Sequence, residues 1–295
     1  MPQVQANGIT FEYMRSGPAD GEPLLLIHGV GAQLIQWPPE WIAAFEREGF
    51  SVIRFDPRDI GLSTHLDHLG FPDLMGAIEA HARGEKADIP YTVVDLADDV
   101  AGLLDALGIE SAHVLGVSLG GIVSQSLVAD HPHKVRSLTI VMSHSSNPDA
   151  PPPTPDVLTK PIPDPREDEE GFVAGSLEMF RAIGSPRFPI PEERLRQFAL
   201  EPMRRAFDPA GFVRQLAAGR TAPDRRAELR KLTIPAIVVH GVQDPLIPIA
   251  GGQDIADNIP GAYMVRIDGL GHDAPPQLAD TLASLAALNA RRAKA

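Results

Sequence analysis

Apolar residues follow two alternating patterns along the 295-residue chain. Continuous apolar runs of about four to eight residues are typical of strands buried on both faces of a sheet; they occur at 24–27, 51–55, 112–117, 135–142, 234–240 and 262–267. Between them, apolar side chains recur every three or four residues, as in helices that pack on a core; these segments are 38–48, 92–107, 122–129, 251–258 and 276–289. The alternation predicts an α/β fold with a mostly parallel central sheet and helices on both faces.

The alternation is interrupted between residues 145 and 230. Eight prolines lie within 147–165, a charged run follows at 166–170, and the later part has helical periodicity with several Phe and Met side chains. We expect an inserted helical lid, entered through a stiff proline-rich link, on a core domain formed by 1–144 and 231–295. A disordered linker is the alternative, but the aromatic side chains of the later part argue against it.

Residues with reactive side chains follow the carboxyl ends of the predicted strands: His28, Asp56, Ser118, Asp244 and His272. In open α/β sheets, ligands bind at this edge. We therefore expect one site that draws its residues from several strands.

The run Gly116-Val-Ser118-Leu119-Gly120 stands where a predicted strand turns into a helix. A serine between two glycines at such a corner has the pattern of a nucleophile elbow. The sharp turn strains the serine backbone and needs small neighbours, which Gly116 and Gly120 provide. We predict that the hydroxyl of Ser118 is exposed above the sheet edge, with the N–H of Leu119 aimed at the same point.

A serine is a weak nucleophile unless a base removes its proton, and the base needs an acid to orient it. With a nucleophile elbow, the acid follows a later strand and the histidine follows the last strand. Asp244 and His272 have these positions and are the predicted acid and base for Ser118. Asp268 and Asp273 are nearer to His272 in sequence, but they share its loop, whereas an orienting acid should brace the base from a separate strand.

Two backbone N–H groups are needed to bind the oxyanion that forms when an acyl group is attacked. Leu119 supplies one of them. The turn His28-Gly29-Val30-Gly31 after an early strand supplies the other, and we expect the donor to be Val30. His28 and Gly29 are then supporting residues of the site.

Composition excludes several other functions. The formal net charge of −13 argues against a general role in binding nucleic acids or anionic membranes. The absence of cysteine excludes disulfides, thiolate chemistry and Cys-ligated zinc. Because we find neither a signal-peptide pattern nor an apolar stretch long enough to span a bilayer, we expect a soluble cytoplasmic protein without membrane insertion. A homodimer is left open.

No cofactor or metal is expected. His65 with His68, and His131 with His133, lack acidic or cysteine partners at metal-ligand spacing. Gly29-x-Gly31 lacks the third glycine of a dinucleotide-binding loop. A chelator should therefore leave the rate unchanged.

Several segments together resemble the α/β-hydrolase fold superfamily: L-L-L-I-H-G-V-G (24–31), V-I-R-F-D-P-R-D-I-G-L-S-T (52–64), A-H-V-L-G-V-S-L-G-G (112–121), H-G-V-Q-D-P-L-I-P (240–248) and G-L-G-H-D (269–273). This resemblance implies Ser118 as nucleophile, Asp244 as acid and His272 as base. It also implies a helical cap over 145–230.

Within the superfamily, the chain is similar to esterase-like members, including anthracycline methyl esterases. The similar segments are Q-W-P-x-x-W from Gln36 to Trp41 and Asp56-x-Arg58-Asp59-x-Gly61. Many other relatives have glycine where Asp59 stands. Haloalkane dehalogenases resemble the fold but use an aspartate nucleophile, which Ser118 argues against.

The expected function is a serine hydrolase that cleaves a carboxylic ester through an acyl-enzyme, with a small molecule as its substrate. The apolar residues of the predicted lid suggest that the substrate has a hydrophobic part. The same triad could hydrolyse a lactone or a C–C bond, or carry out cofactor-free perhydrolysis, and a substrate panel would separate these reactions. A ligand receptor on the same fold is a further alternative, which multiple turnover of p-nitrophenyl esters would exclude.

Overall fold

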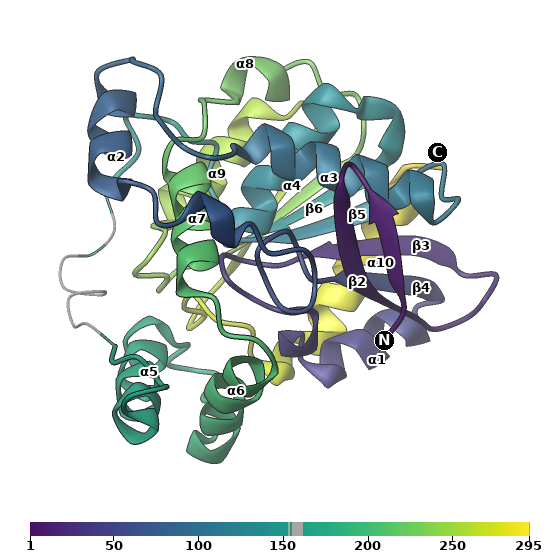
Figure 1. Ribbon diagram of the computed structural model, residues 1–295. Coiled ribbons are helices and arrows are strands. Elements are labelled where there is room, and N and C mark those ends of the chain that lie inside the picture. Colours follow the sequence, from purple (N-terminus) through teal and green to yellow (C-terminus); the bar gives the residue numbers. More distant parts are fainter. Residues whose placement is uncertain (153, 155–161, 295) are drawn as a thin grey trace.

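An eight-stranded sheet crosses the molecule in the computed structural model, which describes residues 1–152, 154 and 162–294 (Figure 1). Its strand order is β1-β2-β4-β3-β5-β6-β7-β8. The strands are β1 (Gln3–Ala6), β2 (Ile9–Ser16), β3 (Glu22–Ile27), β4 (Phe50–Phe55), β5 (Ala112–Val117), β6 (Val135–Val141), β7 (Ala236–Gly241) and β8 (Tyr263–Ile267). Only the β1–β2 and β2–β4 pairs are antiparallel. The predicted α/β class with a mostly parallel sheet is confirmed.

The register of the central strands brings their carboxyl ends level. Ile27 of β3 pairs with Gly116 of β5, and Val117 of β5 pairs with Val141 of β6. All six residues of β5 and all six of β7 are buried, as the continuous apolar runs require. Residues that directly follow these strands therefore meet at one edge of the sheet.

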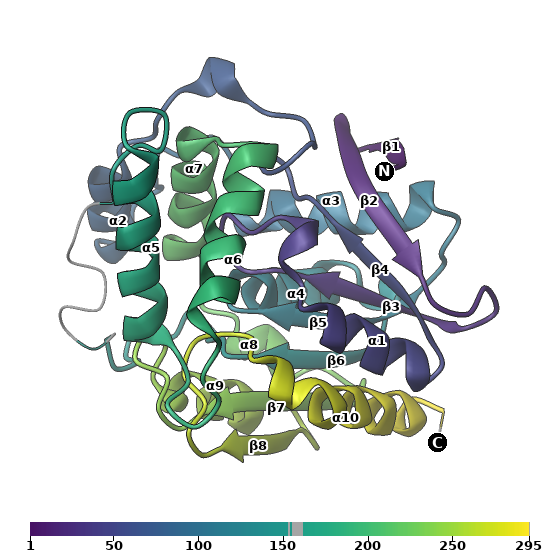
Figure 2. The same ribbon diagram turned by 90° about the horizontal axis from the view of Figure 1, so that it is seen from below.

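Helices cover both faces of the sheet (Figures 1 and 2). One face is covered by three helices, α3 (Val93–Ala106), α4 (Leu119–Asp130) and α9 (Ile249–Asn258). Their apolar residues form one core cluster with the strands. The opposite face is covered by α1 (Pro39–Arg47) and α10 (Ala279–Arg292), which form a second cluster. A capping box is present at the start of α3, where the N–H of Thr92 donates to Asp95 at 2.7 Å.

Residues 65–89, which have no clear period, contain a short 3-10 helix at Asp67–Leu69 and α2 (Leu74–Ala82). The other 3-10 turns are Leu34–Gln36, Pro132–Lys134 and Pro276–Leu278. The charged sequence from Arg291 onward predicts a frayed tail, and this prediction is wrong for Arg292. This residue belongs to α10, donates to the carbonyl of Ala236 at 3.0 Å and stacks on the ring of Tyr263.

The described residues between the neighbouring strands β6 and β7 form four helices: α5 (Glu169–Ile183), α6 (Glu192–Arg205), α7 (Pro209–Arg220) and α8 (Arg226–Leu229). We call them the inserted helices. Helices α5 and α6 lie side by side in both views, and the rings of Phe180 and Phe198 meet edge to face between them (Figures 1 and 2). Asp168 and Asp208 cap the N-termini of α5 and α7. Part of the predicted proline-rich link, residues 153 and 155–161, lies outside the described residues.

Helices in 1–152, 154 and 162–294 are each too short or too polar to cross a bilayer.

Candidate active site

Ser118 occupies a strained turn between β5 and α4. Its backbone has φ 53° and ψ −119°, a conformation that is costly for a residue with a Cβ. The turn depends on its glycines. A Cβ on Gly120 would overlap the carbonyl oxygen of Ile27, and one on Gly116 would overlap Ser124 and the Gly120 carbonyl. Ser118 is the N-cap of α4, but its hydroxyl makes no capping hydrogen bond and is available for other contacts.

The close packing around Gly120 predicts that a side chain at this position destabilises the protein. Replacing Gly120 by alanine should lower the free energy of urea unfolding by about 3 kcal/mol or more, since the backbone of Ile27 and His28 at the end of β3 would have to move. Gly102, inside α3, is a matched control because a Cβ there meets its nearest atom at 3.4 Å, an ordinary contact. Gly102→Ala should be neutral or slightly stabilising. A Gly120→Ala protein within 1 kcal/mol of wild type would contradict the close packing of the elbow.

Three side chains from separate loops form a continuous chain of hydrogen bonds. Nε2 of His272 lies 3.0 Å from Oγ of Ser118, and Nδ1 of His272 lies 2.7 Å from Oδ2 of Asp244. Because a carboxylate only accepts hydrogen bonds, Nδ1 carries a proton and Nε2 of the neutral ring faces the serine as acceptor. The structure thus brings together the predicted nucleophile, base and acid, although their separations in sequence are 154 and 28 residues.

Asp244 is buried and held ionised by its neighbours. Burial alone would raise its pKa, but hydrogen bonds from His240 and His272 and from backbone N–H groups lower the pKa to about 2. Oδ1 accepts from the N–H of Leu246 at 2.9 Å and from that of Ile247 at 2.8 Å. The carboxylate is therefore fixed in place and charged at neutral pH, as an orienting acid must be.

The loop that carries His272 packs on the end of α5. The N–H of His272 donates to the carbonyl of Ile183 at 2.7 Å. Asp273 accepts from the N–H of Ser185 at 3.1 Å, and Asp268 pairs with Arg187 on the surface at 2.6 Å. Among the described residues, neither Asp268 nor Asp273 is hydrogen-bonded to the imidazole of His272. Asp244 therefore remains the candidate for the orienting acid.

The turn after β3 lies against the nucleophile. A Cβ on Gly29 would sit 3.4 Å from Cβ of Ser118, so the turn and the elbow are in direct contact. Leu119 is the first residue of α4, where an N–H has no acceptor within the helix. The N–H of Val30 has no acceptor in the described part of the chain. Among the described residues, neither predicted oxyanion donor is therefore hydrogen-bonded to another group of the protein.

His28 shapes this turn. Its Nδ1 accepts from the N–H of Gly29 at 2.7 Å, and its ring lies 4.3 Å from that of Trp37 between centroids. Burial lowers the pKa of His28 from 6.5 to about 4. The ring is therefore neutral at pH 7, consistent with an accepting Nδ1.

Acid should destabilise the fold through His28. Between pH 6.5 and about 4 the unfolded chain binds a proton at this histidine and the folded chain does not, so stability is full above pH 6.5 and falls as the pH drops. From pH 7 to pH 5 the loss from this group is about 2 kcal/mol. Urea unfolding of wild type and His28→Asn at both pH values measures it, and the variant should lose correspondingly less. Equal losses in the two proteins would refute the assignment.

Three polar residues near the site have roles that the sequence pattern does not reveal. Asp56, at the end of β4, is fully buried and accepts from the N–H groups of Leu34 and Leu62, so it braces loops and faces no reacting atom. Ser143 donates to the carbonyl of Ser118 at 2.8 Å. Gln215 of α7 accepts from the N–H of Gly31 at 2.9 Å.

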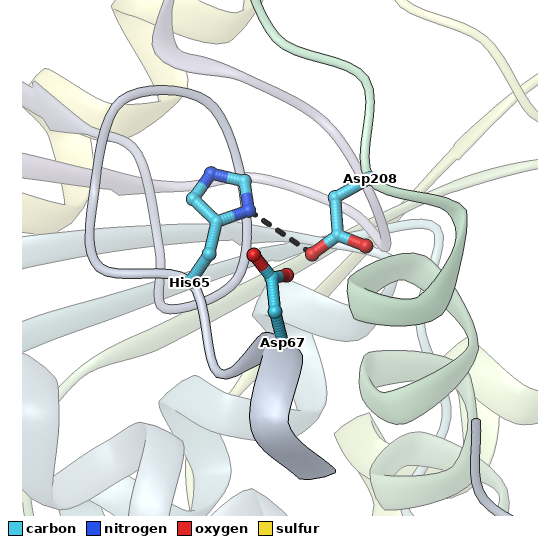
Figure 3. A group of neighbouring side chains, drawn as sticks. All are labelled: His65, Asp67 and Asp208. Carbon is cyan, nitrogen blue, oxygen red and sulfur yellow. Dashed lines mark hydrogen bonds and ion pairs between the residues drawn. The ribbon is translucent and has the colours of Figure 1, made fainter. Parts of the chain in front are cut away.

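Within the described residues, one group of side chains has ligand atoms close enough to suggest a metal: His65, Asp67 and Asp208 (Figure 3). Both ring nitrogens of His65 are already engaged, with Asp208 at 3.0 Å and with the carbonyl of Gly61 at 2.8 Å. Asp208 also caps α7 through the N–H of Gly211. The group is a structural link between a loop and α7, and His68 is not part of it.

Comparison with known proteins identifies the family of the chain. The family model of the alpha/beta hydrolase fold matches residues 22–277. The chain belongs to the α/β hydrolase fold family. The resemblance noted from the sequence segments is thereby confirmed at the level of the family.

Relatives within this family of hydrolases differ in the substrate that their names indicate. The rhodomycin D methylesterase DauP of Streptomyces sp. strain C5 is 28% identical over 94% of this chain and 93% of its own length. The 2-hydroxymuconate semialdehyde hydrolase of Pseudomonas sp. strain CF600 is 27% identical over 96% and 91%. The crystal structure of the esterase RhEst1 from Rhodococcus sp. ECU1013 superposes with a TM-score of 0.71 at 21% identity, covering 96% and 97%, which shows the shared fold.

Proposed function

We propose that this α/β hydrolase is a serine hydrolase that cleaves carboxylic esters through an acyl-enzyme on Ser118. The observation that carries the proposal is the unbroken hydrogen-bond chain from Ser118 through His272 to Asp244. This chain lies beside two free backbone donors at the end of a strained turn. The similarity to a methylesterase over nearly the whole chain supports an ester as substrate.

The first half of the reaction forms the acyl-enzyme. Oγ of Ser118 attacks the carbonyl carbon while Nε2 of His272 takes its proton. The N–H groups of Leu119 and Val30 stabilise the oxyanion of the tetrahedral intermediate, as preorganised donors do in acyl transfer. When the intermediate collapses, His272 gives the proton to the departing alcohol.

The second half returns the enzyme to its starting state. A water molecule replaces the alcohol, His272 removes its proton, and the hydroxide attacks the acyl group on Ser118. Collapse of this second intermediate releases the carboxylic acid and returns a proton to Oγ. Throughout, the carboxylate of Asp244 keeps the imidazole in the required tautomer and stabilises the imidazolium.

We also propose that residues 145–230 form a lid over the site. Support comes from α7, since the side chain of Phe212 contacts the turn at Gly31 and is 41% exposed. An exposed aromatic ring beside the predicted oxyanion donor favours a substrate with a hydrophobic part. Under this proposal 1–144 and 231–295 form the core domain.

A substrate panel tests the proposed function. Purified protein is assayed with p-nitrophenyl esters of increasing acyl length, methyl esters of bulky aromatic acids, a lactone and a vinylogous C–C hydrolase substrate. We expect multiple turnover and higher kcat/KM for esters with an apolar group than for acetate. Turnover confined to small polar esters would contradict the proposal that the substrate has a hydrophobic part. A C–C substrate or lactone that is preferred by more than about tenfold would favour the alternative reactions.

A further inference from the structure

One face of α7 lies against both parts of the predicted oxyanion hole. Phe212, Gln215 and Gly219 are spaced by three and four residues and so share that face. The ring of Phe212 lies against Gly31, and Gln215 accepts from the N–H of Gly31 at 2.9 Å. At the other end of the helix, a Cβ on Gly219 would lie 2.9 Å from the side chain of Leu119.

Gln215 bonds in two directions. Oε1 accepts from Gly31, while Nε2 donates to the carbonyl of Arg58 at 3.1 Å. Because one partner is an N–H and the other a carbonyl, the amide has a single favourable orientation. The side chain is only 1% exposed, so water cannot replace either bond. Gly31 follows Val30 directly and has φ +70°, so holding its peptide constrains the position of the Val30 N–H.

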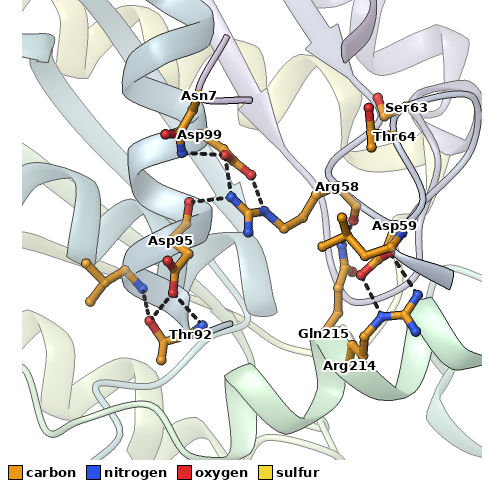
Figure 4. A network of polar contacts seen from close by, with 12 residues as sticks. Asn7, Arg58, Asp59, Ser63, Thr64, Thr92, Asp95, Asp99, Arg214 and Gln215 are labelled. Atoms are coloured by element: carbon orange, nitrogen blue, oxygen red, sulfur yellow. Dashed lines mark hydrogen bonds and ion pairs between the residues drawn. The ribbon is translucent and has the colours of Figure 1, made fainter. Parts of the chain in front are cut away.

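The carbonyl that Gln215 contacts is itself held rigidly. The guanidinium of Arg58 donates to both carboxylate oxygens of Asp99, at 2.5 and 2.6 Å (Figure 4). Arg58 also precedes Asp59, a residue with φ 69° whose carboxylate is fully buried. The loop is therefore a fixed support.

An ion pair fixes α7 to the same loop. Arg214, fully buried, donates to both oxygens of Asp59 at 2.8 Å and to the carbonyl of Gly70 at 2.7 Å (Figure 4). Such a forked pair defines both distance and orientation. Arg214 and Gln215 are neighbours in sequence, so the ion pair sets the place from which Gln215 reaches the turn.

We propose that Gln215 is a positioning residue for the reaction, which holds the turn at Gly31 so that the Val30 N–H points at the developing oxyanion. The inference rests on the proposed function. The competing interpretation is that Gln215 only attaches the inserted helices to the core. The two differ in what they predict for the transition state, since a displaced donor weakens oxyanion binding while substrate binding is little affected.

The test compares Gln215→Met with Gln33→Met. Gln33 is an equally buried glutamine, two residues beyond Gly31, that attaches the loop to α6 through the carbonyls of Pro202 and Ala206, both at 2.8 Å. Each variant is assayed for kcat and KM, and for inhibition by an aryl trifluoromethyl ketone, whose adduct with Ser118 carries an oxyanion. Active sites are counted by titration with a fluorophosphonate, so that misfolded protein does not enter kcat.

Gln215→Met should lower kcat and raise the inhibition constant by about 10- to 100-fold each, with KM within about threefold, because a single oxyanion donor is worth about 10²- to 10³-fold. Gln33→Met should leave all three within about threefold. If Gln215→Met does not fold, Gln215→Leu serves instead, since its apolar side chain also removes both hydrogen bonds. A fall in kcat of about tenfold is then expected.

Equal losses in the Gln215 and Gln33 variants would overturn the inference, and so would a folded Gln215 variant with unchanged kcat and inhibitor affinity. In both cases a wild type whose turnover depends on Ser118 leaves the proposed function standing. A wild type without such turnover would refute both proposals.

Discussion

Replacing Ser118 by alanine should reduce kcat for ester hydrolysis by about 10⁴- to 10⁶-fold, with little change in KM or in thermal stability. In the proposed reaction this hydroxyl supplies the atom that becomes acylated, and among the described residues no other side chain is hydrogen-bonded to Nε2 of His272. The hydroxyl makes no capping bond to α4, so its removal leaves the helix intact. Initial rates on a p-nitrophenyl ester, followed over several turnovers, measure the effect.

Ser126→Ala is the matched control. Ser126 lies in the same helix, is fully buried and has a hydroxyl without a hydrogen-bond partner among the described residues. Its loss should leave kcat within about twofold. If Ser118→Ala kept more than about one hundredth of the wild-type kcat, another group would have to be the nucleophile.

Asp244→Asn should reduce kcat by about 10³- to 10⁴-fold at neutral pH. The amide loses the negative charge that stabilises the imidazolium. It also presents an N–H₂ group that can turn the imidazole into the wrong tautomer, so that a proton at Nε2 faces Ser118. The hydrogen bonds from Leu246 and Ile247 can still be accepted by the amide oxygen, so the loop should keep its place.

Asp268→Asn is the control for this change, since Asp268 belongs to the loop of His272 but pairs with Arg187 at the surface. It should retain kcat within about threefold. Thermal unfolding of both variants shows whether the fold is kept. A folded Asp244→Asn enzyme with a kcat near that of wild type would remove Asp244 from the mechanism, and a large loss in Asp268→Asn would transfer the role to that residue.

Local pattern in the sequence was enough to predict much of the sheet and the elbow. Buried parallel strands appear as continuous apolar runs, and the Gly-x-Ser-x-Gly corner reports a steric requirement that only glycine meets. The order of Ser118, Asp244 and His272 along the chain follows the order of the strands that precede them, which is why the sequence predicts both partners of the serine.

Contacts between the inserted helices and the core could not be predicted in this way. Gln215 and Gly31 are separated by 184 residues, and Arg214 and Asp59 by 155, with no periodicity to connect them. Asp59 was visible only as a departure from the glycine that many relatives have. The structural role of Asp59 depends on Arg214 of α7, whose guanidinium donates hydrogen bonds to it. Long-range polar pairs of this kind arise from tertiary packing, whereas patterns in the sequence indicate only local geometry.

Ser118 is the residue that we propose forms the covalent intermediate, and labelling with a fluorophosphonate tests this role. Wild type is incubated with the reagent, residual esterase activity is followed, and the modified peptide is located by mass spectrometry. We predict one adduct per chain, on Ser118, with activity lost in proportion to labelling and no adduct in Ser118→Ala. An adduct on another residue, or full activity in a protein labelled at Ser118, would contradict the claim.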